Sequence, residues 1–328
     1  MFDLLTLLKN SLATVVKATK IVRKVMHSGE FGEVSKSDGT PVTIADRAVQ
    51  YIIESETRAV FPNIFIVGEE GKITKESILP SLLEDSDTFG FPTSVFDQAE
   101  LLVRTSFVDP SLSIGLREED LTMYIDPIDA TWSFVHGDHK EVSVLCGVCN
   151  KAGVPLFGIV CFPFRGDDLD KCLFYGGRAI GVSPSVLKER RFNGEREDIF
   201  KNDRLLRPLL CSSSGYYYRP HEDPLMISLS EHFETKIIKL GGAGAKMHSI
   251  FSLQSDIYFY PWSTTNFWDT CAGQAIVEGA GGIVTDKFGK VIVYPRGIVP
   301  QNKDGLIGFT KCEIYETLKK LHIFPKKK

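Results

Sequence analysis

The nine residues MYIDPIDAT, at positions 123–131, are the most informative stretch of this chain. The first three are typical of a buried strand. Asp126 and Asp129 follow with a proline between them, so the chain turns sharply at a point where both carboxylates can face one place. Hard divalent cations such as Mg²⁺ bind such oxygen ligands, and the backbone carbonyl of Ile128 can complete the shell. An Asp-Pro dipeptide is also a common turn, so the motif alone leaves that interpretation open.

Three further acids stand where a ligand site would use them. Glu69 and Glu70 follow a short apolar run, at 64–67, which predicts a buried strand that ends in two carboxylates. The ends of strands are a frequent place for ligands, although an exposed acidic turn is also possible. Asp269, in FWDTCAG at 267–273, opens a predicted helix and could equally be an ordinary N-terminal cap.

The remaining pattern predicts a chain that mixes helices and strands. Apolar positions at helical spacing predict helices over 4–26 and 43–60, and residues 71–120 read as an irregular insertion with short helices. Strand and hairpin patterns follow at 142–149, 156–162 and 171–174. Beyond them strands alternate with helices, with strands expected at 209–212, 235–240, 257–260 and 282–285 and helices at 245–253 and 269–278.

A length of 328 residues suggests two domains. We expect an α+β domain over 1–185 that carries most of the metal site. We expect an α/β domain over 186–328 that completes the site and forms the substrate pocket. The charged stretch at 186–207, which is poor in large apolar residues, is the best candidate for a linker between them.

Composition narrows the classes of partner. The net charge of −4 provides no basic field for a nucleic-acid polymer or an anionic membrane. No run of 18 apolar residues predicts a membrane span, and the N-terminus lacks the features of an export signal, so we expect a cytoplasmic protein. Seven cysteines indicate free thiols, and Cys146 and Cys149 read as buried strand residues rather than a zinc or redox pair.

The acidic motifs occur together in one order. Asp46 lies in PVTIAD, and GEE at 68–70, DPIDAT at 126–131 and WDTCAG at 268–273 follow it over about 230 residues. With these four motifs the chain resembles the lithium-sensitive, Mg²⁺-dependent phosphatases of the inositol monophosphatase family. The resemblance implies the layered αβαβα sandwich of that family and a phosphomonoesterase activity on a small-molecule phosphate ester.

The resemblance also implies roles for individual residues. One Mg²⁺ would be bound by Glu69, Asp126 and the Ile128 carbonyl, a second by Asp126, Asp129 and Asp269, and a third weakly through Glu69. Two such metals activate a water on one side of a phosphate and stabilise the leaving alkoxide on the other. A pair of Thr131 and Asp46 would orient and deprotonate the attacking water, with Glu70 as a second acceptor.

Several residues are candidates for binding the substrate. The N–H groups of Ala130 and Thr131 lie at a turn or helix start, where exposed amides favour anions. Two loops rich in small residues follow in the second half, and each could instead be a tight turn. Their candidates are Ser213 in SSSG at 212–215 and Gly242, Ala243 and Lys246 in GGAGAK at 241–246. We expect His248 to be a structural helix residue rather than a ligand.

Within the family two branches fit, and the stretch 142–164 looks most like the inositol polyphosphate 1-phosphatases. The first expectation is therefore removal of the 1-phosphate from inositol polyphosphates such as inositol 1,4-bisphosphate. The alternative is a 3′(2′),5′-bisphosphate nucleotidase that acts on adenosine 3′,5′-bisphosphate. A basic residue often precedes the Trp-Asp pair in these branches, whereas Asn266 and Phe267 stand here. An inactive protein that only binds a phosphorylated metabolite also remains possible. The protein could be a monomer or a homodimer.

Overall fold

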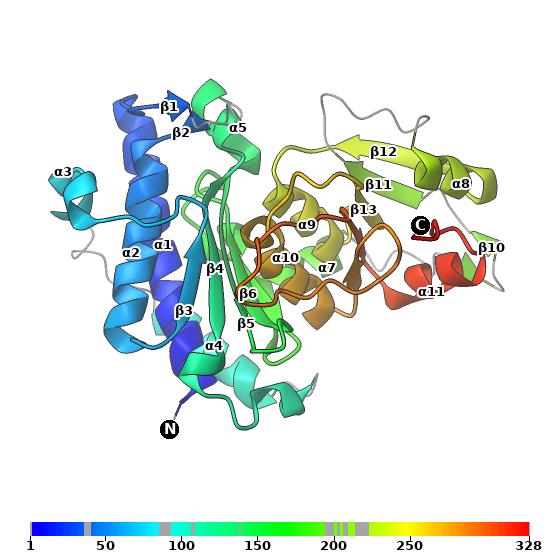
Figure 1. Ribbon diagram of the computed structural model, residues 1–328, viewed down its shortest axis with the longest axis horizontal. Coiled ribbons are helices and arrows are strands. Elements are labelled where there is room, and N and C mark those ends of the chain that lie inside the picture. The colour runs from blue at the N-terminus through cyan, green and yellow to red at the C-terminus, as the bar shows by residue number, and fades with distance from the viewer. Residues whose placement is uncertain are drawn as a thin grey trace.

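Layers of helices and sheets alternate across the molecule in the order αβαβα (Figure 1). The computed structural model describes residues 2–35, 41–84, 93–105, 109–137, 139–193, 200–201, 204–205, 209–213 and 223–327. Three clusters of buried apolar side chains fill the spaces between the layers. The layered sandwich predicted from the sequence is therefore confirmed.

The first layer consists of two long helices, α1 (Leu4–Ser28) and α2 (Ile44–Val60). Each begins at a residue whose side chain accepts hydrogen bonds from the first N–H groups, Asp3 for α1 and Thr43 for α2. Their apolar faces pack on the neighbouring sheet, because that is how an amphipathic helix removes its apolar stripe from water. Both helices lie where the sequence pattern predicts them.

The second layer is a six-stranded sheet with the order β3-β4-β5-β6-β7-β8. Only β3 and β4 run parallel; the other neighbours are antiparallel. Helices cover both faces, so β5 and β6 are buried along their whole length, including Cys146 and Cys149 as predicted. The strands are β3 (Phe65–Gly68), β4 (Thr122–Asp129), β5 (Ser143–Cys149), β6 (Pro155–Cys161), β7 (Leu173–Gly177) and β8 (Gly181–Val182).

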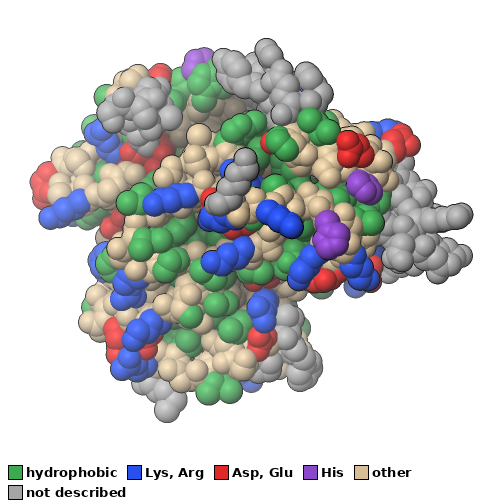
Figure 2. Space-filling view, turned by 45° about the vertical axis from the view of Figure 1, so that its right-hand side comes forward, with side chains coloured by type: hydrophobic (Ala, Val, Ile, Leu, Met, Phe, Trp, Pro, Cys, Tyr) green, Lys and Arg blue, Asp and Glu red, His purple; other side chains and the backbone are tan. Residues whose placement is uncertain are grey.

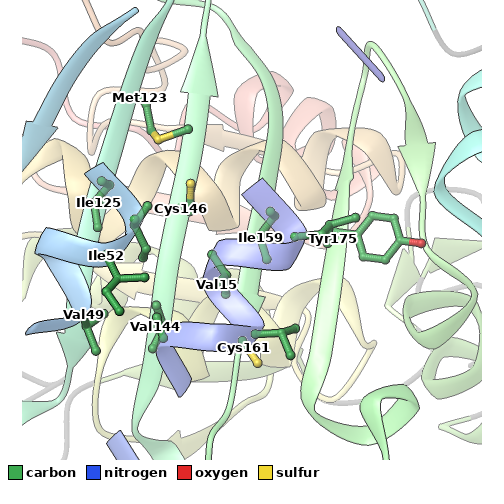
Figure 3. Packing of buried hydrophobic residues seen from close by; sticks show 14 of the residues in the cluster. Val15, Val49, Ile52, Met123, Ile125, Val144, Cys146, Ile159, Cys161 and Tyr175 are labelled. Carbon is green, nitrogen blue, oxygen red and sulfur yellow. The ribbon is translucent and has the colours of Figure 1, made fainter. Parts of the chain in front are cut away.

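Alternation along the central strands divides their side chains between two cores. Met123 and Ile125 of β4 face α1 and α2, whereas Tyr124 faces the third layer. Figure 3 shows Val15 of α1 and Ile52 of α2 among the side chains of the sheet. Side chains thus pack on both faces of the sheet, and this packing fixes the positions of the ends of β3 and β4.

The third layer contains α9 (Ala243–Phe251) and α10 (Phe267–Gly279), which pack between the two sheets. The fourth layer is a five-stranded sheet, and α8 (Pro224–His232) and α11 (Cys312–Lys320) cover its outer face. In spatial order its strands are β12 (Thr235–Lys239), β11 (Leu209–Ser213), β13 (Ile257–Tyr260), β15 (Leu306–Phe309) and β14 (Ile283–Thr285).

The segment between β3 and β4 confirms the predicted insertion with short helices where it is described. It contains α3 (Pro80–Glu84) and α4 (Thr93–Thr105) with short 3₁₀ turns, while residues 85–92 and 106–108 lie outside the described part. Short elements complete the chain. They are β1 (Val34–Ser35), β2 (Pro41–Val42), α5 (Thr131–His136), α6 (Leu169–Cys172), β9 (Phe200–Lys201) and β10 (Arg204–Leu205).

Two predictions about local structure are wrong. The strand expected from residue 171 begins at Leu173, because α6 occupies the preceding turn. The linker expected from residue 186 instead starts as α7 (Pro184–Phe192), which is docked: Arg190 donates to the Phe251 carbonyl (3.1 Å) and Asn193 to the Ser252 carbonyl (2.6 Å). The division of the chain at 185/186 remains a proposal, and β15 and α11 lie in a segment for which the sequence pattern gave no prediction.

The surface agrees with the low net charge. On the face in Figure 2, Lys and Arg side chains are scattered among apolar and acidic ones. In the part of the chain that the structure describes, no helix has both the length and the apolar character needed to cross a bilayer.

Candidate metal centre

The parallel pairing of β3 with β4 brings two acids together. Gly68 at the end of β3 is opposite Ile125 of β4, and the Glu69 N–H donates to the Ile125 carbonyl over 3.1 Å. The residue after each of these partners is an acid, Glu69 on one strand and Asp126 on the other. The strand register therefore places these two carboxyl groups side by side.

A break in the pairing of β4 with β5 aims two aspartates at one place. Asp126 is opposite Leu145 and Asp129 is opposite Ser143, so three residue steps on β4 match two on β5. In a regular strand, residues three apart point to opposite faces. An extra residue removes that alternation locally, and such bulges often lie beside active sites. Pro127, which has no N–H to donate, is tolerated there.

Asp129 is held in place by the start of α9. One carboxylate oxygen accepts from the Ala243 N–H (2.9 Å), and the other accepts from the Gly244 N–H (2.8 Å) and the Ser143 hydroxyl (3.0 Å). A carboxylate has about four acceptor sites, so roughly one remains for another ligand. Gly242 permits this approach, because its φ is +60° and a Cβ there would lie 2.5 Å from the Asp129 carboxylate.

Asp269 reaches the same place from the other half of the chain. It lies in the first turn of α10, and its carboxylate accepts from the Asn266 N–H over 2.6 Å. This is the capping role that the sequence left open, and Asp269 also hydrogen-bonds with Asp126. The carboxylate thus fixes the helix start and joins the acidic cluster at once.

Burial and mutual repulsion disfavour ionisation of these acids. Burial raises the pKa of Asp126 well above its ordinary value, and Glu69, Asp129 and Asp269 raise it further. Burial raises the pKa of Asp269 to about 8, although the hydrogen bond from Asn266 opposes the shift. For Asp129 burial also raises the pKa, partly offset by its bonds from Ala243 and Gly244. Acids in this state favour a proton or a cation between them.

The donor set fits a divalent cation. Asp126 is 2% exposed and hydrogen-bonds with the carboxyl groups of Glu69 and Asp269, which requires a shared proton. Its Oδ1 is buried and has no hydrogen-bond partner among the described residues. In those same residues no three acidic, His or Cys side chains have the separations of a preassembled metal site. A hard cation would replace the shared proton as the group that holds the carboxylates together.

Asp46 and Thr131 do not form the predicted pair. The Asp46 carboxylate accepts from the Thr43 N–H (2.7 Å) and hydroxyl (2.6 Å), whereas the Thr131 hydroxyl donates to the Ile128 carbonyl (2.8 Å). Thr43 caps α2 three residues before Asp46, and this local capping box occupies one oxygen of the Asp46 carboxylate. Burial raises the pKa of Asp46 to about 7, against the effect of the Thr43 bonds.

Gln50 is a positioning residue that the sequence analysis missed. Its amide accepts from the Glu70 N–H (2.9 Å) and donates to the Gly71 carbonyl (2.7 Å), so it fixes the turn that carries Glu69 and Glu70. The signal was present, since Gln50 is four residues after Asp46 on the buried face of α2. Ser143 was missed as well, because a serine in an apolar strand gives no hint of its long-range partner Asp129.

The structure supports some of the predicted substrate-binding residues and not others. Lys246 is 4% exposed, and its Nζ donates to the Gly242 carbonyl over 2.7 Å. The Ala243 N–H is occupied by Asp129 rather than directed at open space. Ala130 adopts a left-handed conformation with φ +65° just before α5, whose first N–H groups have no partner inside the helix. The side chain of Ser213, and all of 214–215, lie outside the described residues.

His248 does not join the carboxylates, as expected. It is buried, pairs with Glu189 (2.8 Å), and meets the ring of Phe174 edge to face. With seven other residues it lines a cavity of about 500 Å³ beside the loop at 240–245. The lining residues are Lys140, Glu141, Phe164, Arg165, Leu240, Ala245, His248 and Gln254.

Comparison with known proteins agrees with this geometry. The model of the inositol monophosphatase family matches residues 3–319. The 3′(2′),5′-bisphosphate nucleotidase 1 of Dictyostelium discoideum is 30% identical, covering 88% of this chain and 87% of the relative. The human protein of the same name is 26% identical over 93% and 90%. Human inositol polyphosphate 1-phosphatase is 28% identical, but over 74% and 71%.

Solved structures show the same fold. The suhB protein of Bartonella henselae superposes with a TM-score of 0.61 at 18% identity, covering 96% of this chain and 99% of that one. The Thermotoga maritima IMPase TM1415 has a TM-score of 0.57 at 21% identity, covering 96% and 97%. The family typically uses divalent metal ions such as Mg²⁺, which the clustered carboxylates suit. The chain belongs to the inositol monophosphatase family and is a metal-dependent phosphomonoesterase of that family.

Proposed function

We propose that this protein is a Mg²⁺-dependent 3′(2′),5′-bisphosphate nucleotidase that acts on adenosine 3′,5′-bisphosphate. The chemistry rests on one observation: Glu69, Asp126, Asp129 and Asp269 converge from three different elements, and burial raises the pKa of all three aspartates. The substrate rests on similarity, because the nucleotidases align over up to 93% of the chain and the inositol polyphosphate 1-phosphatases over 74%. The first sequence expectation therefore becomes the second candidate.

Two or three Mg²⁺ ions per site are part of this proposal. Glu69, Asp126 and the Ile128 carbonyl would hold one ion, and Asp126, Asp129 and Asp269 a second, with a weaker third through Glu69. Asp126 suits the shared position, since its Oδ1 accepts no hydrogen bond from any described residue. Asp129 suits a single metal contact, because three hydrogen bonds already occupy its oxygens. When bound, the ions neutralise the phosphate charge and activate water.

Other residues of the chain would orient the attacking water and accept its proton. Asp46 has one buried oxygen, Oδ1, with no hydrogen-bond partner among the described residues, and this oxygen can accept a proton from water. Its other oxygen is anchored by Thr43, so the carboxylate cannot rotate freely. Glu70, fixed by Gln50 through its N–H, is the second acceptor. Thr131 orients the water or the phosphate through its hydroxyl, which now rests on the Ile128 carbonyl.

Backbone amides and one buried cation would receive the phosphate. The N–H groups of Ala130 and Thr131 lie at the start of α5, directly after Asp129, where amides favour an anion. Lys246 brings a positive charge close to the acids, as its interaction with Asp129 indicates. Gly242 and Ser213 complete the set of proposed contacts, with Gly242 acting through its backbone.

The second candidate is an inositol polyphosphate 1-phosphatase. The sequence at 153–158 and 163–164 favours it, as does 28% identity to the human enzyme of that name. Both candidates use the same metal centre, so the site chemistry does not separate them. The difference lies in the group that surrounds the scissile phosphate.

A side-by-side substrate panel tests the proposal. Release of inorganic phosphate from adenosine 3′,5′-bisphosphate and inositol 1,4-bisphosphate is measured with Mg²⁺ at equal substrate concentrations. We expect the higher kcat/KM for the nucleotide and inhibition of both reactions by Li⁺. Preferred cleavage of the inositol phosphate would reverse the ranking, and no Mg²⁺-dependent release from either would overturn the proposed function.

A further inference from the structure

A loop from far along the chain holds the start of α10. Residues 299–302 run beside the segment that leads into the helix, where Asn266 and Gln301 form an antiparallel bridge. The Phe267 N–H donates to the Pro300 carbonyl over 2.7 Å. The first N–H groups of a helix have no partner within it, and helix ends fray easily. The 299–302 loop supplies one such partner, so the first turn of α10 is fixed from outside the helix.

The side chain of Asn302 extends this contact into the interior. It is 5% exposed, and its Nδ2 lies 3.0 Å from the Asn266 carbonyl and 3.1 Å from the hydroxyls of Thr265 and Thr270. The two hydrogens on Nδ2 are thus shared among three acceptors. Its Oδ1 is buried and accepts no hydrogen bond from any residue that the structure describes. Asn302 therefore serves the start of α10 through its donor atom.

The three acceptors belong to residues that flank Asp269 in the chain. The Asn266 N–H donates to the Asp269 carboxylate over 2.6 Å, and the Thr270 hydroxyl donates to the Asn266 carbonyl over 3.2 Å. Asp269 hydrogen-bonds in turn with Asp126. One amide thus joins the residue that anchors the Asp269 carboxylate to the residue that follows it. A movement of Asn266 would turn this carboxylate away from Asp126.

We propose that Asn302 is a positioning residue of the metal centre, whose amide holds the Asp269 carboxylate in the direction of Asp126. The inference rests on the metal centre of the proposed function and is independent of which phosphate ester is cleaved. A buried oxygen without a partner costs free energy, so the unpaired Oδ1 indicates that the donor on the same side chain has a compensating use. The acids around Asp269 repel one another, and a carboxylate among them keeps its direction only if its anchor is rigid.

Titration of Mg²⁺ into the metal-free protein by calorimetry tests the proposal. Asn302→Leu keeps the branched shape of the side chain but removes its donor. Groups that orient a metal ligand contribute about 10- to 100-fold in metal affinity, so the apparent Kd for Mg²⁺ should rise by that factor. Asn302→Ala removes the same donor with a smaller side chain, and it provides a second variant if leucine does not fit.

Gln301→Leu is the matched control. The Gln301 Nε2 donates to the Ser263 carbonyl over 2.6 Å, so this change removes the same kind of bond from the same loop. Its partner lies three residues before Asn266 and has no contact with the anchor of Asp269 through that bond. The Kd for Mg²⁺ should therefore stay at the wild-type value.

Two further measurements separate positioning from a purely structural role. The backbone bonds of the 299–302 loop do not depend on the side chain of Asn302, so circular dichroism should show a folded metal-free protein in every variant. Turnover of Asn302→Leu should need more Mg²⁺ for its half-maximal rate, while kcat and KM return toward the wild-type values at saturating Mg²⁺. A general loosening of the fold would instead lower kcat at every Mg²⁺ concentration.

The outcomes distinguish this inference from the proposed function. If the wild-type protein neither binds Mg²⁺ nor shows Mg²⁺-dependent turnover, the metal centre fails and Asn302 has nothing to position. If the wild type binds Mg²⁺ and both Asn302 variants bind it with the same Kd, only the positioning role is overturned. An equal loss in Gln301→Leu would also overturn it, because the loop rather than the Asn302 amide would be responsible. Weaker binding in the Asn302 variants alone, with kcat restored by excess Mg²⁺, supports it.

Discussion

The two ends of α10 hold two partly buried acids with opposite surroundings. At the start Asp269, with its pKa raised to about 8, faces Glu69, Asp126 and Asp129. In the last turn burial raises the pKa of Glu278 to about 7, but its neighbours are the Gln274 amide and Arg178. Glu278 can be accommodated by one proton, whereas the acids around Asp269 repel each other and favour a cation. Convergence of acids, rather than burial of one, distinguishes a metal site.

The largest expected effect comes from Asp126→Asn. The change keeps the size of the side chain but removes the carboxylate that joins Glu69 to Asp269, so Mg²⁺-dependent turnover should fall by about 10³-fold or more. The fold should persist, since one repelling charge is lost. Phosphate release and circular dichroism check this, with Glu278→Gln as the buried-acid control that should retain activity. Near wild-type turnover would remove Asp126 from the shared position.

Gly242→Ala should have the next largest effect. A side chain at φ +60° costs about 1–3 kcal/mol, and its Cβ would also press on the Asp129 carboxylate. We expect a loss of stability and at least about a tenfold loss of kcat/KM. Gly281→Ala is the matched control, because its φ is +88° but nothing lies within 4 Å. Equal activity in the two variants would mean that the approach of α9 to Asp129 does not matter for catalysis.

Mg²⁺ should stabilise the protein through the first end of α10 only. Metal at about 100 times its dissociation constant adds about 2.7 kcal/mol, which for a chain of this length is a rise in Tm of roughly 4 °C. Thermal melts with Mg²⁺ and with a chelator measure this. The shift should shrink strongly in Asp126→Asn and persist in Glu278→Gln. An undiminished shift in Asp126→Asn would place the stabilising ion elsewhere.

The smallest effect is a pH dependence at the other end of α10. The pKa of Glu278 is raised in the folded state, so its unfavourable contribution is absent below about pH 4.5 and grows as pH rises toward 7. Glu278→Gln, which still accepts the Gln274 bond, should raise the free energy of unfolding by about 1–3 kcal/mol at pH 8 and by little at pH 4. Urea unfolding at both pH values measures the difference. A pH-independent gain would show that ionisation of Glu278 is not its cause.

Sequence reasoning succeeded where the signal was local and periodic. The helices at the N-terminus, the strand that carries Asp126 and the helix that carries Asp269 all follow from the apolar pattern, since each buries one face or both. It failed at α7, where a charged composition suggested a linker although Arg190 and Asn193 dock on the end of α9. Long polar side chains can face solvent or can anchor a helix by hydrogen bonds to another element, and composition does not separate the two cases.

The amino-acid sequence by itself determined which chemistry is available, because carboxylates at the ends of strands and at a helix start are hard-cation ligands wherever they are placed. Only the tertiary structure decided how they are used. The register of β3 on β4 sets Glu69 beside Asp126, and the bulge turns Asp129 to the same side. The capping box of α2 gives Asp46 to Thr43 rather than to Thr131. These partners are far apart in the chain or compete locally, and folding selects among them by hydrogen-bond satisfaction and packing, which no spacing encodes.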